Sequence, residues 1–482
     1  MSSENIHSGS SLQPSALQQQ NNLIQSNILQ LPSELLIRIF ILSQNTALVK
    51  VCKRFYHIST SSFIRAQFLI QRYGRSQALG EISMKSFRMA FTLPVIDSLI
   101  KLRCSPLADG NYLVWRACEE NNIRLFILLV DAIQPDTKTL QRYLRVAALK
   151  GSISILDLIV KRYGGIIKYS NNNNNNNRKI LLSTSSITYT EEEKTIMTMA
   201  CNANQVEMVK HLIQRYDCDP HVQQDIYLRK ACLDGFEELV MVLLSGADIH
   251  AMNDTPLQNA VHRNHIAIVD LLLKNGADPL VNRYTCLIKS IKNQNPSILF
   301  LLLKCGADPR YQQNELFLLA CREGNFEVFD LLLKMILFHT LPKPTAITTT
   351  AITLSSYEGW KNIFLNEFIH QLQQQQQLQQ DYQPILNELV NCRKGKPLGE
   401  ALKSGHFEIV KTLLELGANP NSICGIEGLN ETILGNHLIC VELMARHGAH
   451  SPYSLSHYLS KHTVKQPMKQ LLQKTCSIFS TD

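Results

Sequence analysis

Gly246-Ala247-Asp248, followed by Gly276-Ala277-Asp278 and Gly306-Ala307-Asp308, is a triplet that recurs every 30 residues along this chain. A fixed period of this length is typical of a stack of small structural units rather than of one globular core. Such a stack offers an extended surface and usually contains no catalytic pocket. The sequence therefore predicts a repeat array whose task is binding.

Two further positions keep this period. The first holds a small residue that permits close helix packing, and the second, four residues later, holds Gly or Asn, which tolerate a left-handed backbone at a helix end. The small residues are Ala117, Ala147, Ala200, Ala231, Ala260, Ser290, Ala320 and Ala401. The residues in the second position are Asn121, Gly151, Asn204, Gly235, Asn264, Gly324, Gly405 and Gly435. Each unit is predicted to contain a helix, a tight turn and a second helix.

Three residues depart from this pattern. Gln294 takes the left-handed position of one unit, and Phe87 and Glu431 take the small-residue position of the first and last units. A carboxylate buried without a partner is costly. End units face solvent on one side, so we expect both end exceptions to be tolerated there.

Thr255-Pro256-Leu257, the segment Ala260 to His265 and the apolar run Ile268 to Leu273 complete one unit around Gly276-Ala277-Asp278. This pattern resembles the ankyrin repeat. The resemblance covers residues 85–335 and 396–452 and implies an all-α solenoid that binds proteins. The units are about three residues shorter than the usual ~33. We therefore expect short loops between them.

The spacing of the units also predicts the domain organisation. Low-complexity segments bury too little apolar surface to fold, so we expect them to leave the array as loops. The predicted parts are a disordered Gln/Ser-rich tail (1–26), a helical motif (27–70), repeats (84–164, 194–335 and 396–452), an Asn-rich insert (165–193), a Thr/Gln-rich insert (336–395) and a capping helix (453–482). In the second insert, Trp360, Phe364, Leu365 and Phe368 follow helical spacing and suggest a degenerate repeat.

Residues 31–69 do not follow the repeat. Leu31-Pro32 precedes a predicted helix in which Leu35, Leu36, Ile39 and Phe40 form an apolar face. About 40 residues are too few to build a core alone. A partner or the array itself must therefore cover this face.

Leu31-Pro32, Glu34-Leu35, Ile39-Phe40, Val51-Cys52 and Phe55-Tyr56 resemble an F-box. The resemblance implies docking onto a Skp-type adaptor and, through it, onto a cullin-based ubiquitin ligase. The adaptor-binding residues that it implies are Leu31, Pro32, Glu34, Leu35, Ile39, Phe40, Val51, Cys52 and Phe55. Alternatively, these helices only cap the first repeat.

The composition favours an intracellular protein without nucleic acid or membrane partners. The net charge of +8 is small for 482 residues, and Lys and Arg are scattered, whereas a nucleic-acid surface concentrates them. Cys118, Cys201, Cys232 and Cys321 each follow an Ala, which indicates packing residues in a reducing compartment, cytoplasmic or nuclear. Neither a secretory signal nor an apolar membrane span is visible.

The sequence carries no recognised catalytic, metal or cofactor motif. His262 and His265 lack a third ligand, and Asp248, Asp278 and Asp308 lie about one repeat apart, so we expect the three carboxylates to cap loops. We therefore predict a protein that is not an enzyme and needs no metal or cofactor. The leading hypothesis is the substrate-recognition subunit of a ubiquitin ligase, and the alternative is a passive scaffold.

Overall fold

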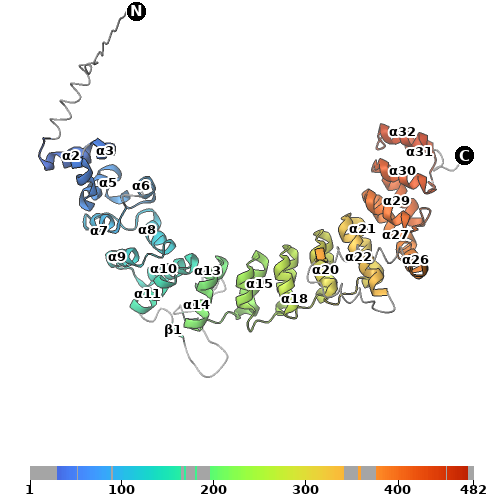
Figure 1. Ribbon diagram of the computed structural model, residues 1–482, viewed down its shortest axis with the longest axis horizontal. Helices are drawn as coiled ribbons and strands as arrows, with labels where there is room; N and C mark the ends of the chain where they lie inside the picture. Colours follow the sequence, from blue (N-terminus) through green and yellow to red (C-terminus); the bar gives the residue numbers. More distant parts are fainter. Residues whose placement is uncertain are drawn as a thin grey trace, which may run out of the picture. The chain divides into compact units, whose positions relative to one another are not determined.

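The computed structural model describes residues 30–51, 53–87, 91–163, 168–169, 180–181, 196–340, 357–359, 376–451 and 453–475. The chain divides into two compact units, unit 1 (Met1–Cys218) and unit 2 (Asp219–Asp482), and both are built from helices (Figure 1). The predicted tail 1–26 and the four predicted helical residues Trp360, Phe364, Leu365 and Phe368 lie outside the described residues.

Unit 1 begins with a helical segment and continues as pairs of helices. Its helices are α2 (Ser33–Ser43), α3 (Leu48–Val51), α4 (Lys53–Thr60), α5 (Ser62–Gln77), α6 (Glu81–Ser86), α7 (Leu93–Lys101), α8 (Ala108–Glu119), α9 (Ile123–Ile133), α10 (Thr137–Lys150), α11 (Ile153–Tyr163), α13 (Ile196–Asn202) and α14 (Val206–Tyr216). An antiparallel ladder of two residues a strand, β1 (Lys168–Tyr169) with β2 (Ile180–Leu181), lies in the first insert. Apart from this ladder, the described chain is helical, which confirms the predicted all-α fold class.

Unit 2 consists of helix pairs from its first residues onward. Its helices are α15 (Val222–Asp234), α16 (Glu237–Leu243), α17 (Ala251–His262), α18 (Ile266–Lys274), α19 (Val281–Lys292), α20 (Pro296–Lys304), α21 (Tyr311–Glu323), α22 (Phe326–Thr340), α26 (Gln376–Val390), α27 (Cys392–Ser404), α28 (Phe407–Glu415), α29 (Ile423–Leu434), α30 (Leu438–Arg446), α31 (Leu455–Ser460) and α32 (Gln466–Lys474). Two helices, α31 and α32, thus lie where the sequence predicts one capping helix. No described helix is long and apolar enough to cross a bilayer.

The small residue and the left-handed residue shape each helix pair as the sequence predicts. The small residues from Ala117 to Ala401 are buried, and the backbone turns left-handed four residues later, as at Gly235 (φ 84°) and Asn264 (φ 62°). Gln294 adopts the same conformation (φ 55°) despite its side chain. The turn geometry therefore holds even where the residue type departs from the pattern.

In the last predicted repeat the alignment from the sequence is wrong by one residue. Thr432, not Glu431, is buried in the small-residue position, and Asn436 (φ 63°), not Gly435 (φ −74°), takes the left-handed position. The Thr432 hydroxyl donates to the carbonyl oxygen of Leu402 in the preceding unit (2.8 Å). Glu431 is exposed, so no carboxylate is buried here.

Short left-handed turns join the end of one unit to the next first helix. At Met252, Asn253 and Asp254 three successive residues have φ values of 51°, 59° and 52°. Equivalent runs occur at Gln223–Asp225 and Gln312–Asn314. The prediction of short loops is confirmed in these units, because a single left-handed turn makes each connection.

The helices that flank each insert pack directly on one another, as α10 does with α13 and α21 with α27. In unit 1 the Gln205 side chain donates to the carbonyl oxygen of Leu149 (3.3 Å) across the first insert. In unit 2 the ring Nε2 of His406 lies 2.9 Å from the carbonyl oxygen of Arg322 across the second. Each array therefore continues past its insert without a gap in the helix packing.

Candidate functional site

The N-terminal helices of unit 1 share a small aromatic core. Leu36 and Phe40 of α2 pack with Phe55 of α4 and Phe68 of α5, and all four side chains are buried. The rings of Phe40 and Phe68 stack with centroids 5.2 Å apart. Because the chain covers this face itself, the segment has its own core.

The predicted adaptor-binding residues fall into three groups. Pro32, Glu34 and Leu35 are exposed, and Leu31 and Ile39 are partly buried against the core. Phe40 and Phe55 are buried within it, so in this structure they pack inside the segment and offer no surface to an adaptor. The Val51 side chain and the whole of Cys52 lie outside the described residues.

Helix α2 carries a second apolar face that the core leaves uncovered. Leu35 is 43% exposed and Leu42 is 65% exposed, and their separation of seven residues places them on one side of the helix. Leu36 and Phe40 occupy the opposite, buried side. The sequence prediction missed Leu42, although its spacing from Leu35 indicates the same face.

The core of this segment also contacts the start of the array. Phe87, which follows α6, meets Phe68 edge to face, with ring centroids 5.8 Å apart. Helix α5 packs along α7, the second helix of the first repeat. The N-terminal segment and the first repeat of unit 1 are therefore continuous in their packing.

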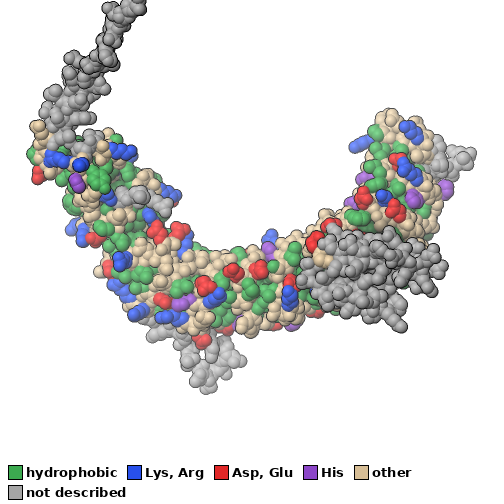
Figure 2. All heavy atoms as spheres, in the orientation of Figure 1, with side chains coloured by type: hydrophobic (Ala, Val, Ile, Leu, Met, Phe, Trp, Pro, Cys, Tyr) green, Lys and Arg blue, Asp and Glu red, His purple; other side chains and the backbone are tan. Residues whose placement is uncertain are grey.

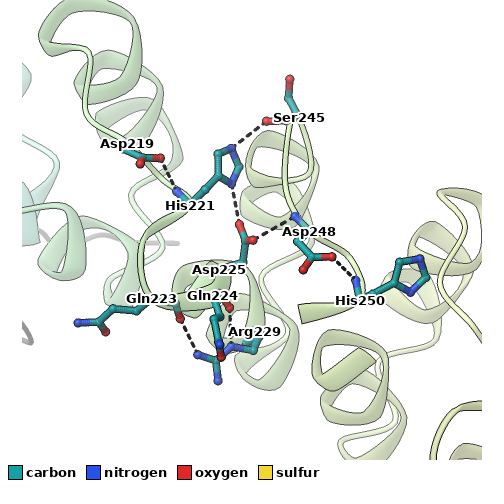
Figure 3. Close-up of polar contacts among 9 residues, drawn as sticks. All are labelled: Asp219, His221, Gln223, Gln224, Asp225, Arg229, Ser245, Asp248 and His250. Carbon is teal, nitrogen blue, oxygen red and sulfur yellow. Dashed lines mark hydrogen bonds and ion pairs between the residues drawn. The ribbon is translucent and has the colours of Figure 1, made fainter. Parts of the chain in front are cut away.

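In unit 2 the loops between repeats carry a chain of hydrogen bonds, drawn in Figure 3. His221 Nδ1 lies 2.6 Å from one oxygen of Asp225, and its Nε2 lies 3.1 Å from the carbonyl oxygen of Ser245. The other Asp225 oxygen accepts the backbone N–H of Asp248 in the next loop (3.0 Å). Asp225 therefore links its own loop to the following one.

The next loop repeats this arrangement. His250 Nδ1 lies 2.9 Å from Asp254, whose carboxylate accepts the backbone N–H of Asp278 (3.1 Å). Asp225 and Asp254 are each only 4% exposed. Their burial is possible because each carboxylate accepts hydrogen bonds from two loops. We call this chain of hydrogen bonds, formed by His221, Asp225, His250 and Asp254, the loop relay. The sequence prediction missed it, although the spacing His-x-x-x-Asp occurs at both places.

The triplet carboxylates have the role that the sequence predicts. Asp248, Asp278 and Asp308 each accept the backbone N–H two residues later, at 2.8–3.0 Å, and so cap the start of a loop. In the later units Asn419 and Asn421 continue the scheme, and Asn421 accepts the backbone N–H of His450 (2.7 Å). These side chains are structural loop caps.

The relay changes where other residues replace its histidine and aspartate. Tyr284 occupies the position equivalent to Asp254, with φ 62°, and stacks on Tyr311 of the next unit at 3.8 Å. Asn314 follows in the same position, and its buried side-chain oxygen accepts no hydrogen bond. Left-handed backbone costs roughly 1–2 kcal/mol per non-glycine residue. These two loops therefore hold strained backbone.

The turn histidines have structural roles. His265 Nε2 lies 3.2 Å from the carbonyl oxygen of Leu233, as His406 lies near Arg322, so each ring bridges to the preceding unit. Within the described parts of the chain, no group of three or more His, Cys, Asp or Glu side chains could hold a metal ion.

In unit 1 charged side chains connect successive repeats. Asp157 of α11 accepts hydrogen bonds from Tyr216 and contacts His211 of α14, both at 2.7 Å. Partial burial raises the pKa of Asp157, but the hydrogen bonds from His211 and Tyr216 outweigh burial and bring this pKa below its usual range. Burial and Asp157 also raise the pKa of the Tyr216 hydroxyl. This cluster joins the helices on either side of the first insert.

The four cysteines that follow an alanine are packing residues, as predicted. Cys118, Cys201, Cys232 and Cys321 are all buried. Burial raises the pKa of the Cys118 and Cys232 thiols to about 12. At this pKa the thiols stay protonated and unreactive at neutral pH.

Comparison with family models identifies part of the array. Residues 228–313 match a model of three ankyrin repeat copies, and residues 397–424 match a model of a single ankyrin repeat. These two segments are ankyrin repeats. Because ankyrin repeats are protein-interaction modules, the chain carries a protein-binding array. Residues 30–60 match a different model, described as the YDR249C N-terminal domain, so the F-box resemblance of this segment stays a prediction.

Solved ankyrin repeat domains also match the chain. The human ASB11 ankyrin repeat domain is 18% identical and covers 52% of this chain and 96% of its own length, with a TM-score of 0.35. An ankyrin repeat domain from Acinetobacter baumannii AYE is 23% identical over 40% of this chain and 96% of that domain, with a TM-score of 0.31. The Bcl-3 ankyrin repeat domain is 19% identical over 51% and 97%, with a TM-score of 0.31. No curated protein sequence matches the chain.

Proposed function

We propose that this chain is the substrate-recognition subunit of a cullin-type ubiquitin ligase. The N-terminal helices bind a Skp-type adaptor, and the ankyrin repeats bind the protein to be modified. The observation that carries the proposal is the uncovered apolar face of α2, with Leu35 and Leu42 exposed opposite the buried Leu36 and Phe40. A soluble helix that is apolar on two sides normally has a partner on each.

Covering the exposed leucine side chains of this face would favour the binding of an adaptor. Covering a leucine side chain completely is worth about 1.5–3 kcal/mol, and Leu35 and Leu42 both remain available. Pro32 and the partly buried Leu31 and Ile39 extend the same end of the segment. The proposed adaptor surface is therefore Leu31, Pro32, Leu35, Ile39 and Leu42, with the buried Phe40 and Phe55 supporting it from inside.

The mechanism needs no catalytic group in this chain. Holding a target beside a ubiquitin-charged enzyme turns a bimolecular encounter into an effectively intramolecular one, which is a large source of rate. The array supplies orientation, and the adaptor supplies the enzyme. This protein would work in the cytoplasm or the nucleus.

The test is recovery of an adaptor and a cullin with the tagged full-length chain from native lysate. We expect both with the wild type and neither with Leu35→Ser combined with Leu42→Ser. Ile423→Ser with Ile439→Ser changes two exposed isoleucines of unit 2 and should leave recovery intact. If the wild type recovers neither protein, the proposal is wrong.

The scaffold alternative rests on a separate observation, the packing of Phe87 on Phe68 and of α5 on α7. In that case the N-terminal helices only close the end of the array. Deleting residues 1–61 removes α2, α3 and α4 and keeps the sequence of α5. Unfolding of unit 1 in this variant supports a cap, whereas a folded unit that loses the adaptor supports docking.

A further inference from the structure

The first helices of the unit 2 repeats carry five cations that have no carboxylate partner within the described part of the chain. Lys230 lies on α15, Arg263 directly follows α17, Lys289 and Lys292 lie on α19, and Lys403 lies on α27. Lys289 is partly buried, and the others are exposed. Among the described residues none of the five has an ion-pair partner. We call these five residues the basic band.

The band follows the repeat. His262, Lys292, Arg322 and Lys403 occupy the same position, two residues after the small residue, in four units that stack in succession. Arg322 pairs with Glu400 of the next unit (2.7 Å). Because α21 packs on α27 across the second insert, this column of basic residues is continuous.

Acidic residues on the same helix ends are fewer. They are Asp234, Glu323 and Glu400, against Lys230, Arg263, Lys289, Lys292, Arg322 and Lys403. Six cations less three carboxylates leave an excess of three positive charges, with His262 counted as neutral. On the face drawn in Figure 2, basic and acidic side chains are interspersed. The band is therefore distinguished by its unpaired cations rather than by a large patch of one sign.

The helix dipole explains only part of the band. It favours a cation in the last turn of a helix, but Lys230 precedes the last turn of α15, and α19 carries two lysines. Two cations near the ends of the corresponding unit 1 helices are paired. Lys150 contacts Glu119 at 2.9 Å, and Arg116 contacts Glu120 at 2.8 Å. A cation near a helix end can therefore be paired with a carboxylate, as Arg322 is in unit 2, but the five residues of the basic band are not.

We propose that the basic band binds an extended acidic segment of the target protein. This inference rests on the ankyrin array being the target-binding part of the proposed function. Packed helices lie about 10 Å apart, and an extended chain advances about 3.3 Å per residue. Acidic residues that recur at every third position of an extended segment would therefore meet the cations of successive repeats.

The observations favour an acidic protein segment over a nucleic acid. Asp234 and Glu323 interrupt the band and would repel a backbone that is charged at every unit. Single-stranded nucleic acids also bind through open aromatic faces on which bases stack. Tyr284 and Tyr311, on the loops of this array, stack on each other at 3.8 Å.

The test measures fluorescence anisotropy of a labelled peptide in which glutamate recurs at every third residue between serine and glycine, added to the full-length protein. Lys289→Gln with Lys292→Gln should weaken binding roughly tenfold, since it removes two neighbouring cations that would each pair with a peptide glutamate. Lys411→Gln with Lys474→Gln removes two exposed lysines outside the band and should leave affinity unchanged. Added salt should weaken the wild-type complex.

Three results would overturn the inference. The first is equal affinity of the wild type and the Lys289/Lys292 variant, with thermal unfolding showing both folded. The second is equal binding of a peptide whose glutamates form one block, which contradicts the extended geometry. The third is tighter binding of a single-stranded DNA oligonucleotide that the same variant abolishes.

The adaptor experiment fails or succeeds independently. The Leu35/Leu42 variant should still bind the acidic peptide, and the Lys289/Lys292 variant should still recover the adaptor. If the protein binds the peptide but recovers no adaptor, the inference stands and the ubiquitin-ligase proposal is wrong. If the protein recovers the adaptor but does not bind the peptide, only the inference is contradicted.

Discussion

Unit 1 and unit 2 have the same helix pairs but join successive repeats differently. In unit 1 charged side chains on the helices make the links, as in Lys150–Glu119 (2.9 Å) and Arg162–Asp131 (2.6 Å). In the first repeats of unit 2 the loops make them, through the buried carboxylates of Asp225 and Asp254.

The difference shows how one backbone pattern can serve two tasks. In unit 1 ion pairs such as Lys150–Glu119 contribute directly to the links between repeats. In unit 2 the carboxylates of Asp225 and Asp254 link the first loops, and helix cations contribute only some of the later links, such as Arg322–Glu400. Among the described residues Lys289, Lys292 and Lys403 have no ion-pair partner. The same helix pairs can therefore be linked through loops or through helix side chains.

The largest expected effect concerns the contacts across the inserts, which both units make with a left-handed glycine. A Cβ added at Gly324 (φ 81°) would overlap the His406 ring, and one at Gly151 (φ 73°) would overlap the end of the Gln205 side chain. Because the glutamine can rotate away, we expect Gly324→Ala to cost roughly 3 kcal/mol and Gly151→Ala roughly 1–2 kcal/mol. Urea unfolding with hydrogen exchange of the flanking helices measures both.

Two controls separate overlap from backbone strain. Gly306→Ala places a Cβ in open space at φ 100° and should cost only the strain of about 1 kcal/mol. His406→Ala combined with Gly324→Ala should recover part of the loss. An equal loss in Gly306→Ala and Gly324→Ala would show that the ring contact does not matter.

The next prediction compares the loss of stability on removing a buried carboxylate of the loop relay with the loss on removing an exposed ion pair. Asp254→Ala removes the acceptor for His250 and for the backbone N–H of Asp278, and we expect a loss of roughly 2–3 kcal/mol. Glu119→Ala breaks an exposed ion pair with Lys150 and should cost about 0–1 kcal/mol. Thermal unfolding compares the two variants. Asp254→Asn keeps one acceptor and should lie between them, and equal losses would contradict the difference between the units.

A smaller effect is the acid sensitivity of unit 1. The folded pKa of Asp157 is lowered, so its contribution to stability is present above the ordinary carboxyl pKa of about 4 and is lost as pH falls through the folded value. We expect Asp157→Asn to destabilise unit 1 at neutral pH and to reduce the further loss in acid. Circular dichroism melts across this pH range test the sign.

Asp270→Asn is the control, because Asp270 pairs with Lys274 on the surface of unit 2. It should leave the unit 1 transition unchanged at every pH. If the Asp157→Asn variant loses stability in acid as steeply as the wild type, the prediction is contradicted.

The smallest effect should be the same in both units. Cys118 of unit 1 and Cys232 of unit 2 are buried thiols whose pKa burial raises to about 12. Neither should react with iodoacetamide in the folded protein, whereas the exposed Cys305 should react faster than both. Mass spectrometry of alkylated peptides gives the order. Labelling of Cys118 as fast as Cys305 would show that the core opens.

Local rules made much of the array predictable. A small residue followed at four positions by a left-handed turn depends on backbone sterics and close helix approach, and even Gln294 obeys it. The error at Glu431 has a physical cause. Gly435 and Asn436 can both turn left-handed, and tertiary contacts such as those of Thr432 with Leu402 and of Asn436 with Lys465 favour the second.

The candidate sites were less predictable, because burial depends on partners distant in sequence. Phe40 fits an apolar docking face by spacing, yet Phe68 of another helix covers it. Leu42 remains exposed although it is equally apolar. Helical periodicity indicates that a face must be covered but not which residues cover it.

The sequence by itself determined the repeat, its period, its turns and the capping role of Asp248, Asp278 and Asp308, because neighbouring residues decide these features. Only the tertiary structure decided which charges are paired. Lys150 meets Glu119 from the preceding repeat, whereas Lys292 has no ion-pair partner among the described residues. Pairing requires two side chains from different repeats to come within reach, and the packing of the helices sets that distance.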